Sequence, residues 1–329
     1  MASVSDLPRT MSTPTLTLAP PEPEDVGLVA DLMGVPADAE RPAEIIETWR
    51  EHWETHGYGT WIVRDGSGSR VGFVGLRTNA DFIRLTLRFI EVDGGAVLAA
   101  EALRLVAAYV IEYLPDLPLR IRLAPEDQAT REVVESAGME HVSELDHVVG
   151  EDEWLVLELP YIRIVDRIPP RARTAMLEMW ARVNDTGGAV GFVSGATTED
   201  IAPVLDGYVD GLEAGHTVGV ALNSPEGELI GFGFVVAAAG ALIGHSATLE
   251  RVMTDPARRG RNFGALLMAG LHRAARERGT ELVTLDYRGG TGLGEFYRRH
   301  GYTEVGRVPG AIRVAPGDDR DSVIMARSL

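Results

Sequence analysis

The stretch Pro256 to Leu267, PARRGRNFGALL, has the residue types of an anion-binding turn. Apolar residues recur behind it at three- and four-residue spacing, which predicts a helix that begins near Phe263 and ends at Gly279. The first N–H groups of such a helix lack intrahelical partners and, with the positive end of the helix dipole, attract an anion. Three arginines lie in the turn: Arg258, Arg259 and Arg261. The stretch therefore predicts a pyrophosphate cradle.

Two other phosphate-binding motifs fit this turn less well. A nucleoside-triphosphate loop requires a lysine that reaches the outer phosphates, and all 31 basic residues of this chain are arginine. A dinucleotide-binding turn requires glycines after a strand and an acid about 20 residues later. Asp286 has that spacing, but the first glycine is missing.

The pattern Arg259, Asn262, Gly264 resembles the acyl-CoA turn of the GNAT acetyltransferase superfamily. Asn262 replaces the first glycine of the family, and asparagine tolerates left-handed backbone geometry better than most residues. The segments GTELVTLDYR and GLGEFYRRHGYTEVGR continue the resemblance. It implies an acyltransferase that uses acetyl-CoA as co-substrate. The implied cofactor-binding residues are Val252, Met253, Thr254, Arg258, Arg259, Gly260, Arg261, Asn262, Phe263, Gly264 and Ala265.

Within the superfamily, each half of the chain resembles a different branch. The segments MLEMWARVNDTGGAVGFVSGATTEDI and GRVPGAIRVAPGDDRDSVIMARSL of the C-terminal half are similar to the tabtoxin-resistance acetyltransferases. GAVLAAEALRLV and PEDQATREVVESAGM in the N-terminal half resemble the ribosomal-protein N-terminal acetyltransferases.

The N-terminal half departs from its family at two positions. Gly95, Ala96 and Val97 stand where that family has Gly, any residue, Gly, and valine resists the backbone geometry of a phosphate nest. Asp127 replaces an asparagine of the family. The N-terminal half is therefore expected to be a degenerate copy that does not bind acyl-CoA productively.

Element order predicts two tandem α/β (α+β) domains, each with a central mixed, mostly antiparallel sheet flanked by helices. Residues 1–13 are expected to be a disordered tail, residues 14–159 the degenerate domain and residues 160–329 the catalytic domain. Strands are expected over Gly59–Arg64, Arg70–Arg77 and Ile83–Ile90, and a helix over Gly95–Tyr113. The boundary falls near Leu159–Arg163, where a strand-like segment ends at a proline.

Composition limits the compartment and the partners. The chain of 329 residues has no apolar run long enough for a membrane span and no leader-like start, so we expect a cytoplasmic protein without a membrane partner. It has no cysteine, which excludes a disulfide and a cysteine nucleophile. A formal charge of −18 disfavours nucleic acid and suits a cationic amine. We expect a monomer or a homodimer.

Aminolysis of a thioester requires an oxyanion donor, an acid for the departing thiolate and a base for the amine. The resemblance places the oxyanion donor on a backbone N–H near Val252 or Met253. It places the acid at Tyr297, whose alternative role is to stack on Phe296 and cover the core. A phenol with an ordinary pKa near 10 can protonate a thiolate.

Glu250 is the candidate base. Strand alternation predicts that it shares a face with Thr248 and Thr254. Its alternative role is an ion pair or exposure to solvent. His245 and Ser246 are the fallback, although a lone histidine is more often structural.

Further residues are candidates for acceptor binding. By resemblance, Asn184, Asp185 and Phe192 lie in a loop that lines the acceptor pocket. An acidic cluster near the C-terminus either receives a cationic acceptor or forms a solvated turn between strands; its members are Asp318, Asp319 and Asp321. No metal-ligand pattern is present in the sequence.

The sequence thus predicts an N-acetyltransferase whose C-terminal domain transfers acetyl directly from acetyl-CoA to an amine, with a small molecule as acceptor. Two alternatives remain open. One is a protein N-acetyltransferase, and the other is a catalytically silent acyl-CoA-binding or interaction module.

Overall fold

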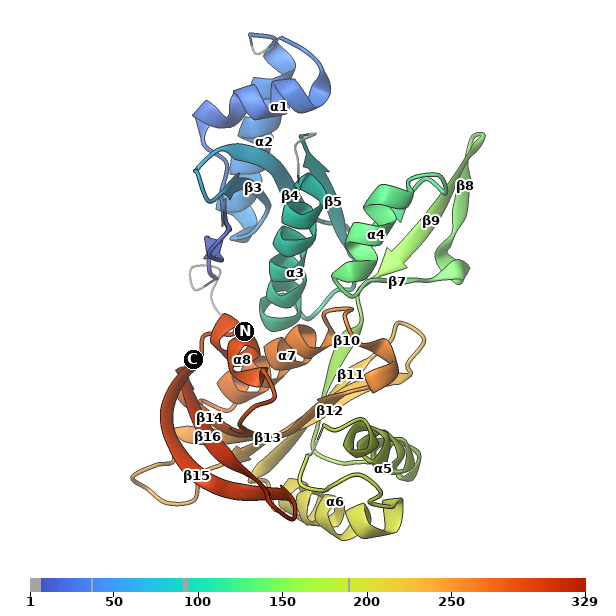
Figure 1. The fold of residues 1–329 in the computed structure, drawn as a ribbon. Helices are drawn as coiled ribbons and strands as arrows, with labels where there is room; N and C mark the ends of the chain where they lie inside the picture. Colours follow the sequence, from blue (N-terminus) through green and yellow to red (C-terminus); the bar gives the residue numbers. More distant parts are fainter. Residues whose placement is uncertain (1–6, 37, 91–93, 189) are drawn as a thin grey trace. The chain divides into compact units, whose positions relative to one another are not determined.

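The computed structural model describes residues 7–36, 38–90, 94–188 and 190–329. The chain divides into unit 1, Met1–Pro160, and unit 2, Tyr161–Leu329. In each unit helices pack on one mixed sheet whose strand pairs are mostly antiparallel (Figure 1). The fold class expected from the sequence is confirmed. In the described part of the chain, no helix is both long enough and apolar enough to cross a membrane.

The sheet of unit 1 has the order β1-β2-β3-β4-β5-β6-β9-β7, and β8 pairs with β9 outside this order. Its only parallel pair within the described residues is β5 with β6. The strands are β1 (Met11–Ser12), β2 (Leu16–Ala19), β3 (Thr60–Asp65), β4 (Arg70–Thr78), β5 (Ile83–Phe89), β6 (Leu119–Leu123), β7 (Glu140–His141), β8 (His147–Val149) and β9 (Asp152–Glu158). The helices are η2 (Pro23–Asp25), α1 (Val26–Met33), α2 (Glu40–His56), α3 (Gly95–Tyr113), α4 (Gln128–Ser136) and η3 (Ser143–Leu145).

The tail of unit 1 differs from the expectation. Residues 1–6 lie outside the described residues, but Met11–Ser12 pairs with β2. The backbone oxygen of Arg9 accepts a hydrogen bond from Trp61 Nε1 at 2.9 Å. The guanidinium of Arg9 lies 5.4 Å from the ring centroid of Trp53. Two buried tryptophans thus hold this segment, so disorder over residues 7–13 was the wrong expectation.

The sheet of unit 2 has the order β10-β11-β12-β13-β14-β16-β15, in which only β13 and β14 pair in parallel among the described residues. The strands are β10 (Tyr161–Val165), β11 (Thr217–Asn223), β12 (Leu229–Ala237), β13 (Ser246–Thr254), β14 (Leu282–Arg288), β15 (Thr303–Ala315) and β16 (Asp318–Ser328). The helices are α5 (Pro170–Asp185), α6 (Thr198–Glu213), η4 (Pro256–Arg258), α7 (Phe263–Glu277) and α8 (Leu293–Arg299).

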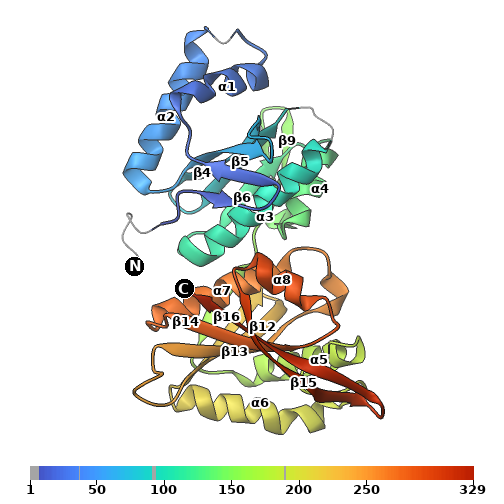
Figure 2. The ribbon, with the colours of Figure 1, turned by 60° about the vertical axis from the view of Figure 1, so that its left-hand side comes forward.

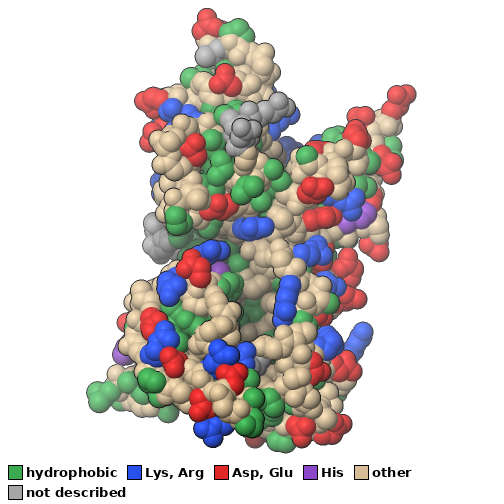
Figure 3. Space-filling model, viewed as in Figure 1, with side chains coloured by type: hydrophobic (Ala, Val, Ile, Leu, Met, Phe, Trp, Pro, Cys, Tyr) green, Lys and Arg blue, Asp and Glu red, His purple; other side chains and the backbone are tan. Residues whose placement is uncertain are grey.

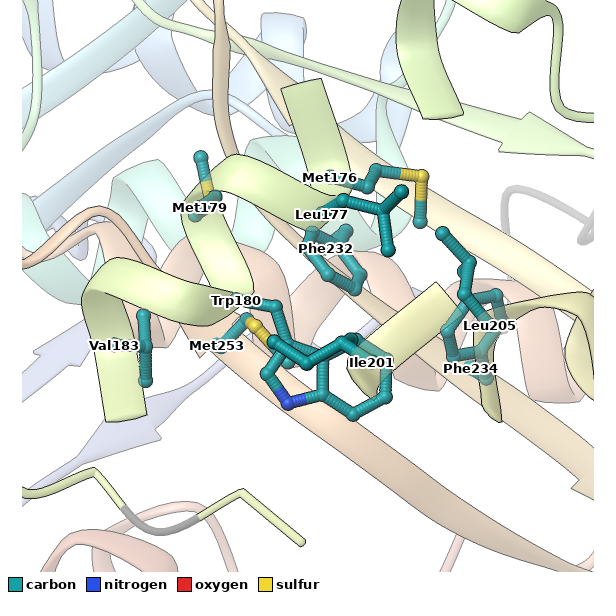
Figure 4. Close-up of a cluster of buried hydrophobic side chains, with 10 residues drawn as sticks. All are labelled: Met176, Leu177, Met179, Trp180, Val183, Ile201, Leu205, Phe232, Phe234 and Met253. Atoms are coloured by element: carbon teal, nitrogen blue, oxygen red, sulfur yellow. The ribbon is translucent and has the colours of Figure 1, made fainter. Parts of the chain in front are cut away.

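Helices cover both faces of the sheet of unit 2, with α5 and α6 on one face and α7 on the other (Figure 2). The α5/α6 face buries an aromatic and aliphatic cluster around Trp180, Phe232 and Phe234 (Figure 4). On the opposite face α7 approaches closely, because a Cβ on Gly233 would lie 3.2 Å from Leu271. Burial of each large apolar side chain contributes roughly 1.5–3 kcal/mol, which fixes the sheet between the two helix layers.

Charge is spread over the surface. The visible face carries acidic side chains on both units with arginines among them (Figure 3). This distribution agrees with the excess of 49 acidic over 31 basic residues.

Candidate active site

The arginine-rich turn has the backbone geometry that the sequence predicted. Asn262 is the N-cap of α7 and adopts a left-handed conformation with φ 64°, and Gly260 has φ 83°. The first hydrogen-bonded turn of the helix begins where Ala265 N donates to Asn262 O at 2.9 Å. The amides of Phe263 and Gly264 precede that turn and donate to no backbone oxygen of the described residues, so they can donate to an anion.

Neighbouring elements hold the arginines of this turn. Arg258 forms an ion pair with Glu228 at 2.8 Å, and Arg259 donates to Thr186 Oγ1 at 3.0 Å. The guanidinium of Arg261 lies 5.4 Å from the ring centroid of Phe263. These contacts place the three positive charges around the start of α7.

Strand β13 parts from β14 beside this helix. Their parallel pairing ends at Thr248 and Thr284, although both strands continue. Backbone groups of β13 beyond Thr248 are therefore not paired to β14. The predicted oxyanion donor, near Val252 or Met253, lies on this stretch, and its role remains a prediction.

A β-bulge in β13 changes which side chains share a face. Phe232 pairs with Met253 and Phe234 with Glu250, so two residues of β13 lie opposite the single residue Gly233. Glu250 and Met253 consequently point to the α5/α6 face, as their partners do. Thr254 points to the other face, which corrects the expectation that it shares a face with Glu250.

The bulge residue Arg251 is strained. It has φ 52°, a left-handed conformation that is uncommon outside glycine and asparagine and often marks functional sites. Its guanidinium lies 5.6 Å from the ring centroid of Trp180 and 5.9 Å from that of Tyr208. Arg251 therefore joins Glu250 on the α5/α6 face, where regular alternation would have separated them.

Glu250 accepts a hydrogen bond from the hydroxyl of Tyr208 on α6. Tyr208 stacks on Phe234 with ring centroids 4.3 Å apart. Burial, and then the hydrogen bond to Glu250, raise the pKa of Tyr208 to about 12, so its hydroxyl stays a donor at neutral pH. Glu250 is thus an oriented carboxylate. Sequence reasoning missed Tyr208 and Arg251, because neither carries a local signal.

Tyr297 lies on α8 and is buried. Its ring lies 5.6 Å from that of Tyr287 on β14 and 5.3 Å from that of Phe296. Burial, followed by the charge of Asp286, raises the pKa of Tyr297 to about 12. Its hydroxyl makes no hydrogen bond to another described residue, so the proton is available to a ligand.

Hydrogen bonds and a ring contact within the segment hold the loop between α5 and α6 in place. Asn184 is buried, and its Oδ1 accepts from Val190 N at 3.1 Å, while Trp180 Nε1 donates to Val190 O at 2.7 Å. Asp185 accepts from Gly195 N at 2.8 Å. Phe192 packs edge-on against Trp180. Asn184 and Asp185 shape the loop, and contact of these residues with an acceptor remains a prediction.

The fallback residues and the acidic cluster lie elsewhere. His245 and Ser246 stand at the start of β13, the end opposite the arginine-rich turn, so they are not placed to act as the base. Asp319 and Asp321 are paired with arginines on β15, and Asp318 is paired with Arg320. The acidic cluster therefore lies at the start of β16, just after the β15–β16 turn, with its carboxylates in ion pairs, where the sequence had offered a solvated turn or an acceptor site.

Comparison with protein families identifies the fold. Residues 15–140 match a family model described as an acetyltransferase (GNAT) domain, and residues 214–304 match a second model of the same description. The chain belongs to the GNAT acetyltransferases. It is therefore an acyltransferase with two GNAT domains, as the sequence predicted.

Solved structures that match part of the chain include several acetyltransferases. A ribosomal-protein-alanine N-acetyltransferase from Brucella melitensis is 20% identical, with a TM-score of 0.43, and the match covers 51% of this chain and 99% of that chain. A GNAT acetyltransferase from Streptococcus pneumoniae is 15% identical, with a TM-score of 0.42 and coverage of 51% and 99%. A nourseothricin acetyltransferase is 24% identical, with a TM-score of 0.31 and coverage of 34% and 65%. The comparison with curated proteins found no match.

The two GNAT domains have the same backbone geometry at the turn that opens the central helix. In unit 1 the left-handed N-cap of α3 is Gly94, with φ 79°, which corresponds to Asn262. The family pattern Gly, any residue, Ala is thus met by Gly94 and Ala96, and Val97 lies inside the helix. The sequence alignment was one residue out of register, so Val97 is not evidence of a damaged turn.

Other features do separate the two GNAT domains. Strands β4 and β5 of unit 1 pair without a break from Gly72–Phe89 to Thr78–Ile83, so β5 lacks the bulge of β13. Met139 N donates to Val134 O as Tyr302 N donates to Tyr297 O, which places Val134 where unit 2 has Tyr297. Unit 1 therefore lacks two features of the candidate site in unit 2.

Proposed function

We propose that unit 2 transfers an acetyl group from acetyl-CoA directly to the amine of a small molecule. The observation that carries this proposal is the opening in the backbone pairing of β13 and β14, which ends at Thr248 and Thr284 on the side of the strands that leads to the arginine-rich start of α7. Glu250 lies on one face of the sheet, and Tyr297 packs against β14 from α8. A thioester that enters this opening would meet a base and an acid from different elements.

The residues at the start of α7 fit the pyrophosphate of acetyl-CoA. The amides of Phe263 and Gly264 would donate to its oxygens, and Arg258, Arg259 and Arg261 would supply positive charge. A Cβ on Gly260 would meet no atom within 4 Å, so the turn has open space around it. Acetyl-CoA supplies an activated acyl group.

In this proposal Glu250 accepts a proton from the ammonium form of the acceptor, directly or through water. The amine nitrogen then forms a bond to the thioester carbonyl carbon, and an N–H of β13 stabilises the oxyanion. When the C–S bond breaks, Tyr297 donates its proton to the departing thiolate, and the second proton of the amine nitrogen, which the amide product does not keep, returns to the Tyr297 phenolate. General acid and base assistance of this kind typically contributes about 100- to 10,000-fold in rate.

The internal ties of the α5–α6 loop favour a small acceptor over a polypeptide. Trp180 and Tyr208 flank the guanidinium of Arg251, Tyr208 also donates to Glu250, and Phe192 packs against Trp180. A long peptide would need an open groove at this position. Because Arg251 adds a positive charge beside Glu250, α-amino acids belong in the set of acceptors to test.

The test uses the full chain with acetyl-CoA and a panel of polyamines, amino acids, amine-bearing ring compounds and peptides with free α-amines. Release of CoA is followed with a thiol reagent, since the chain has no cysteine to give a background. We expect turnover with at least one small amine and slower turnover for Glu250→Gln at neutral pH. That loss should shrink at higher pH, where the amine deprotonates unaided.

Tyr161→Phe, which changes a hydroxyl that accepts from Arg163 on β10, is the control and should match the wild type. Acetylation of peptides alone would replace the small-molecule assignment with a protein acceptor. Absence of both turnover and acetyl-CoA binding would refute the proposed site.

A further inference from the structure

Unit 1 contains a cavity of about 650 Å³ on the face of its sheet that α2 covers. Its walls come from α2, β4, β5, β6 and the start of α4, and the helix contributes residues at helical spacing, among them Ile45, Trp49 and His52. The cavity lies where β5 and β6 part, because their pairing ends at Arg84 and Arg120. On the corresponding face of unit 2 the apolar cluster around Trp180, Phe232 and Phe234 packs against the sheet (Figure 4).

Glycine keeps the floor of this cavity open. A Cβ on Gly75 would lie 2.7 Å from Thr86 Oγ1 and 2.8 Å from Thr60 Oγ1. Gly75 pairs with Thr86 in the sheet, whereas in unit 2 the bulky Phe234 pairs with Glu250 on the corresponding face. The sequence of unit 1 therefore leaves a polar hollow where unit 2 has packed aromatic rings.

Four arginines line the cavity: Arg77, Arg84, Arg88 and Arg122. Arg77 and Arg84 stand directly opposite each other on β4 and β5, and like charges in that position destabilise a sheet. Arg120 on β6 pairs with Arg84 in the sheet, but it forms an ion pair with the carboxylate of Glu158 at 2.6 Å. Arg77 and Arg84 are both exposed and form no ion pair with another described residue, so an anion bound between them would relieve their repulsion.

The remaining contacts leave the cavity positive. Arg88 donates to the backbone oxygen of Leu32 at 3.3 Å, and the Arg122 guanidinium lies 4.9 Å from the ring centroid of Trp154. Within the described ranges, none of the four lining arginines forms an ion pair with a carboxylate. The wall has two acids: Glu51, which is exposed on α2, and Asp127, which accepts from Thr130 N at 3.1 Å as the cap of α4.

His52 adds a hydrogen-bonding group without a partner. Its Nε2 is buried and makes no hydrogen bond to the described residues. Burial, together with the charges of His56 and Arg77, lowers the pKa of His52 to about 4, so the imidazole is neutral at pH 7. A neutral ring nitrogen that carries its proton can donate to a carboxylate.

We propose that this cavity is a binding site for a small organic anion that carries carboxylate groups. Arg77 and Arg84 bind one carboxylate, and Arg88 and Arg122 attract a second. His52 donates a hydrogen bond to the anion. Unit 1 lacks the bulge and the tyrosine of unit 2, so the anion is bound there and is not acetylated.

The first experiment titrates citrate and, separately, acetate and inorganic phosphate into the full chain by calorimetry. We expect one citrate site per chain, with acetate at least about tenfold weaker because it occupies one arginine pair only. Arg77→Gln and Arg84→Gln should each weaken citrate binding by about tenfold or more. The control Arg50→Gln, which removes an α2 arginine paired with Glu47 outside the cavity, should bind citrate like the wild type.

Thermal unfolding provides a second readout that excludes loss of the fold. Without anion, Arg77→Gln should melt at the wild-type temperature or above it, because one of two opposed like charges is gone. With citrate, its melting temperature should rise less than that of the wild type. A variant that melts lower without citrate but binds citrate normally would assign Arg77 to structure alone and overturn the proposal.

Other outcomes would also overturn it. Absence of citrate binding, or equal binding by both variants and the wild type, refutes the site. Binding of phosphate without citrate contradicts the carboxylate assignment. Acetyl-CoA bound at two sites per chain, one of them lost in Arg77→Gln, would make the cavity a coenzyme site.

Discussion

Asn262 shows how one residue sets the geometry of an anion site. Its left-handed backbone turns the chain into α7 and presents the first amides of the helix. Asparagine adopts this conformation more readily than other residues with a Cβ, and glycine adopts it without cost. The side chain at position 262 therefore affects the anion site through its preference for the left-handed backbone conformation. A test should change that conformational preference and nothing else.

We expect Asn262→Gly to retain acetyl-CoA affinity and Asn262→Val to weaken it about tenfold or more. The left-handed conformation costs roughly 1–2 kcal/mol for ordinary residues and more when the side chain is β-branched. Calorimetric titration of acetyl-CoA into the full chain measures both affinities. Equal affinities for the two variants would mean that the amides at the start of α7 do not hold the ligand.

Tyr297→Phe should lower kcat about 100-fold and leave acetyl-CoA affinity unchanged, because only the proton donor is lost. The burial that raises the pKa of Tyr297 to about 12 keeps its proton in place well above neutral pH. The wild-type rate should therefore not decline through Tyr297 ionisation up to about pH 10. The measurements are kcat of the wild type and of Tyr297→Phe, and the pH profile of the wild-type rate. A fall of the wild-type rate at high pH with an apparent pKa near 8 would assign the acid to another group.

At the scale of elements, the bulge in β13 brings the charged residues of the candidate site together. Two residues opposite Gly233 shift the alternation so that Glu250 and Arg251 face the same helices. Strand β5 of unit 1 has no such break. The presence of the bulge in β13 and its absence from β5 distinguish the two units more clearly than their sequences do.

We expect Arg251→Val to destabilise unit 2 relative to Arg251→Gly by about 1–2 kcal/mol. Glycine accepts the left-handed conformation of this residue, whereas a β-branched side chain resists it. Both variants lose the contacts with Trp180 and Tyr208, so the comparison isolates the backbone. Urea unfolding curves of the two variants provide the measurement, and equal free energies of unfolding would argue against a fixed bulge.

Helix α7 buries a titratable group against the last strand. His272 Nε2 bonds to the Tyr302 hydroxyl at 3.0 Å, and Arg327 bonds to Nδ1 at 3.0 Å. Burial, and next the charge of Arg327, lower the pKa of His272 well below 6.5. Below pH 6.5 His272 therefore binds a proton in the unfolded chain but not in the folded chain. The free energy of unfolding decreases as the pH falls through this window.

The free energy of unfolding of unit 2 should thus decrease between about pH 6.5 and 5, with one proton contributing up to about 1.4 kcal/mol per pH unit. His272→Gln removes this proton, so its curve should be shallower than that of the wild type. His300, whose pKa burial also lowers, maintains a residual slope. Parallel curves for wild type and variant would show that His272 titrates alike in both states.

The turn, the helices and the order of the elements along the chain could be predicted, because each depends on local residues. Asn262 and the periodic apolar residues of α7 are examples. The bulge at Arg251 could not be predicted, since it depends on the register against Gly233 on another strand. The adjacent glycines Gly94 and Gly95 left the N-cap of α3 ambiguous by one residue, and only the helix boundary resolved it.

At the scale of the whole molecule, the two domains share a fold but carry different charges at the start of the central helix. Counting back from the N-caps Gly94 and Asn262, the sequence has Glu91 and Asp93 where unit 2 has Arg259 and Arg261. Glu91 and Asp93 lie outside the described residues, but their charge alone disfavours a pyrophosphate.

We therefore expect acetyl-CoA to bind the full chain at one site. Replacement of Arg259 and Arg261 together by alanine should weaken that binding at least about tenfold, because two charge-assisted contacts are lost. Replacement of Arg104, an exposed arginine of α3 that donates to Ser136 O, should not change it. Calorimetry yields the stoichiometry and the affinity in one titration. Two sites of similar affinity, one of which survives the double replacement, would show that unit 1 binds the coenzyme despite the acidic residues Glu91 and Asp93.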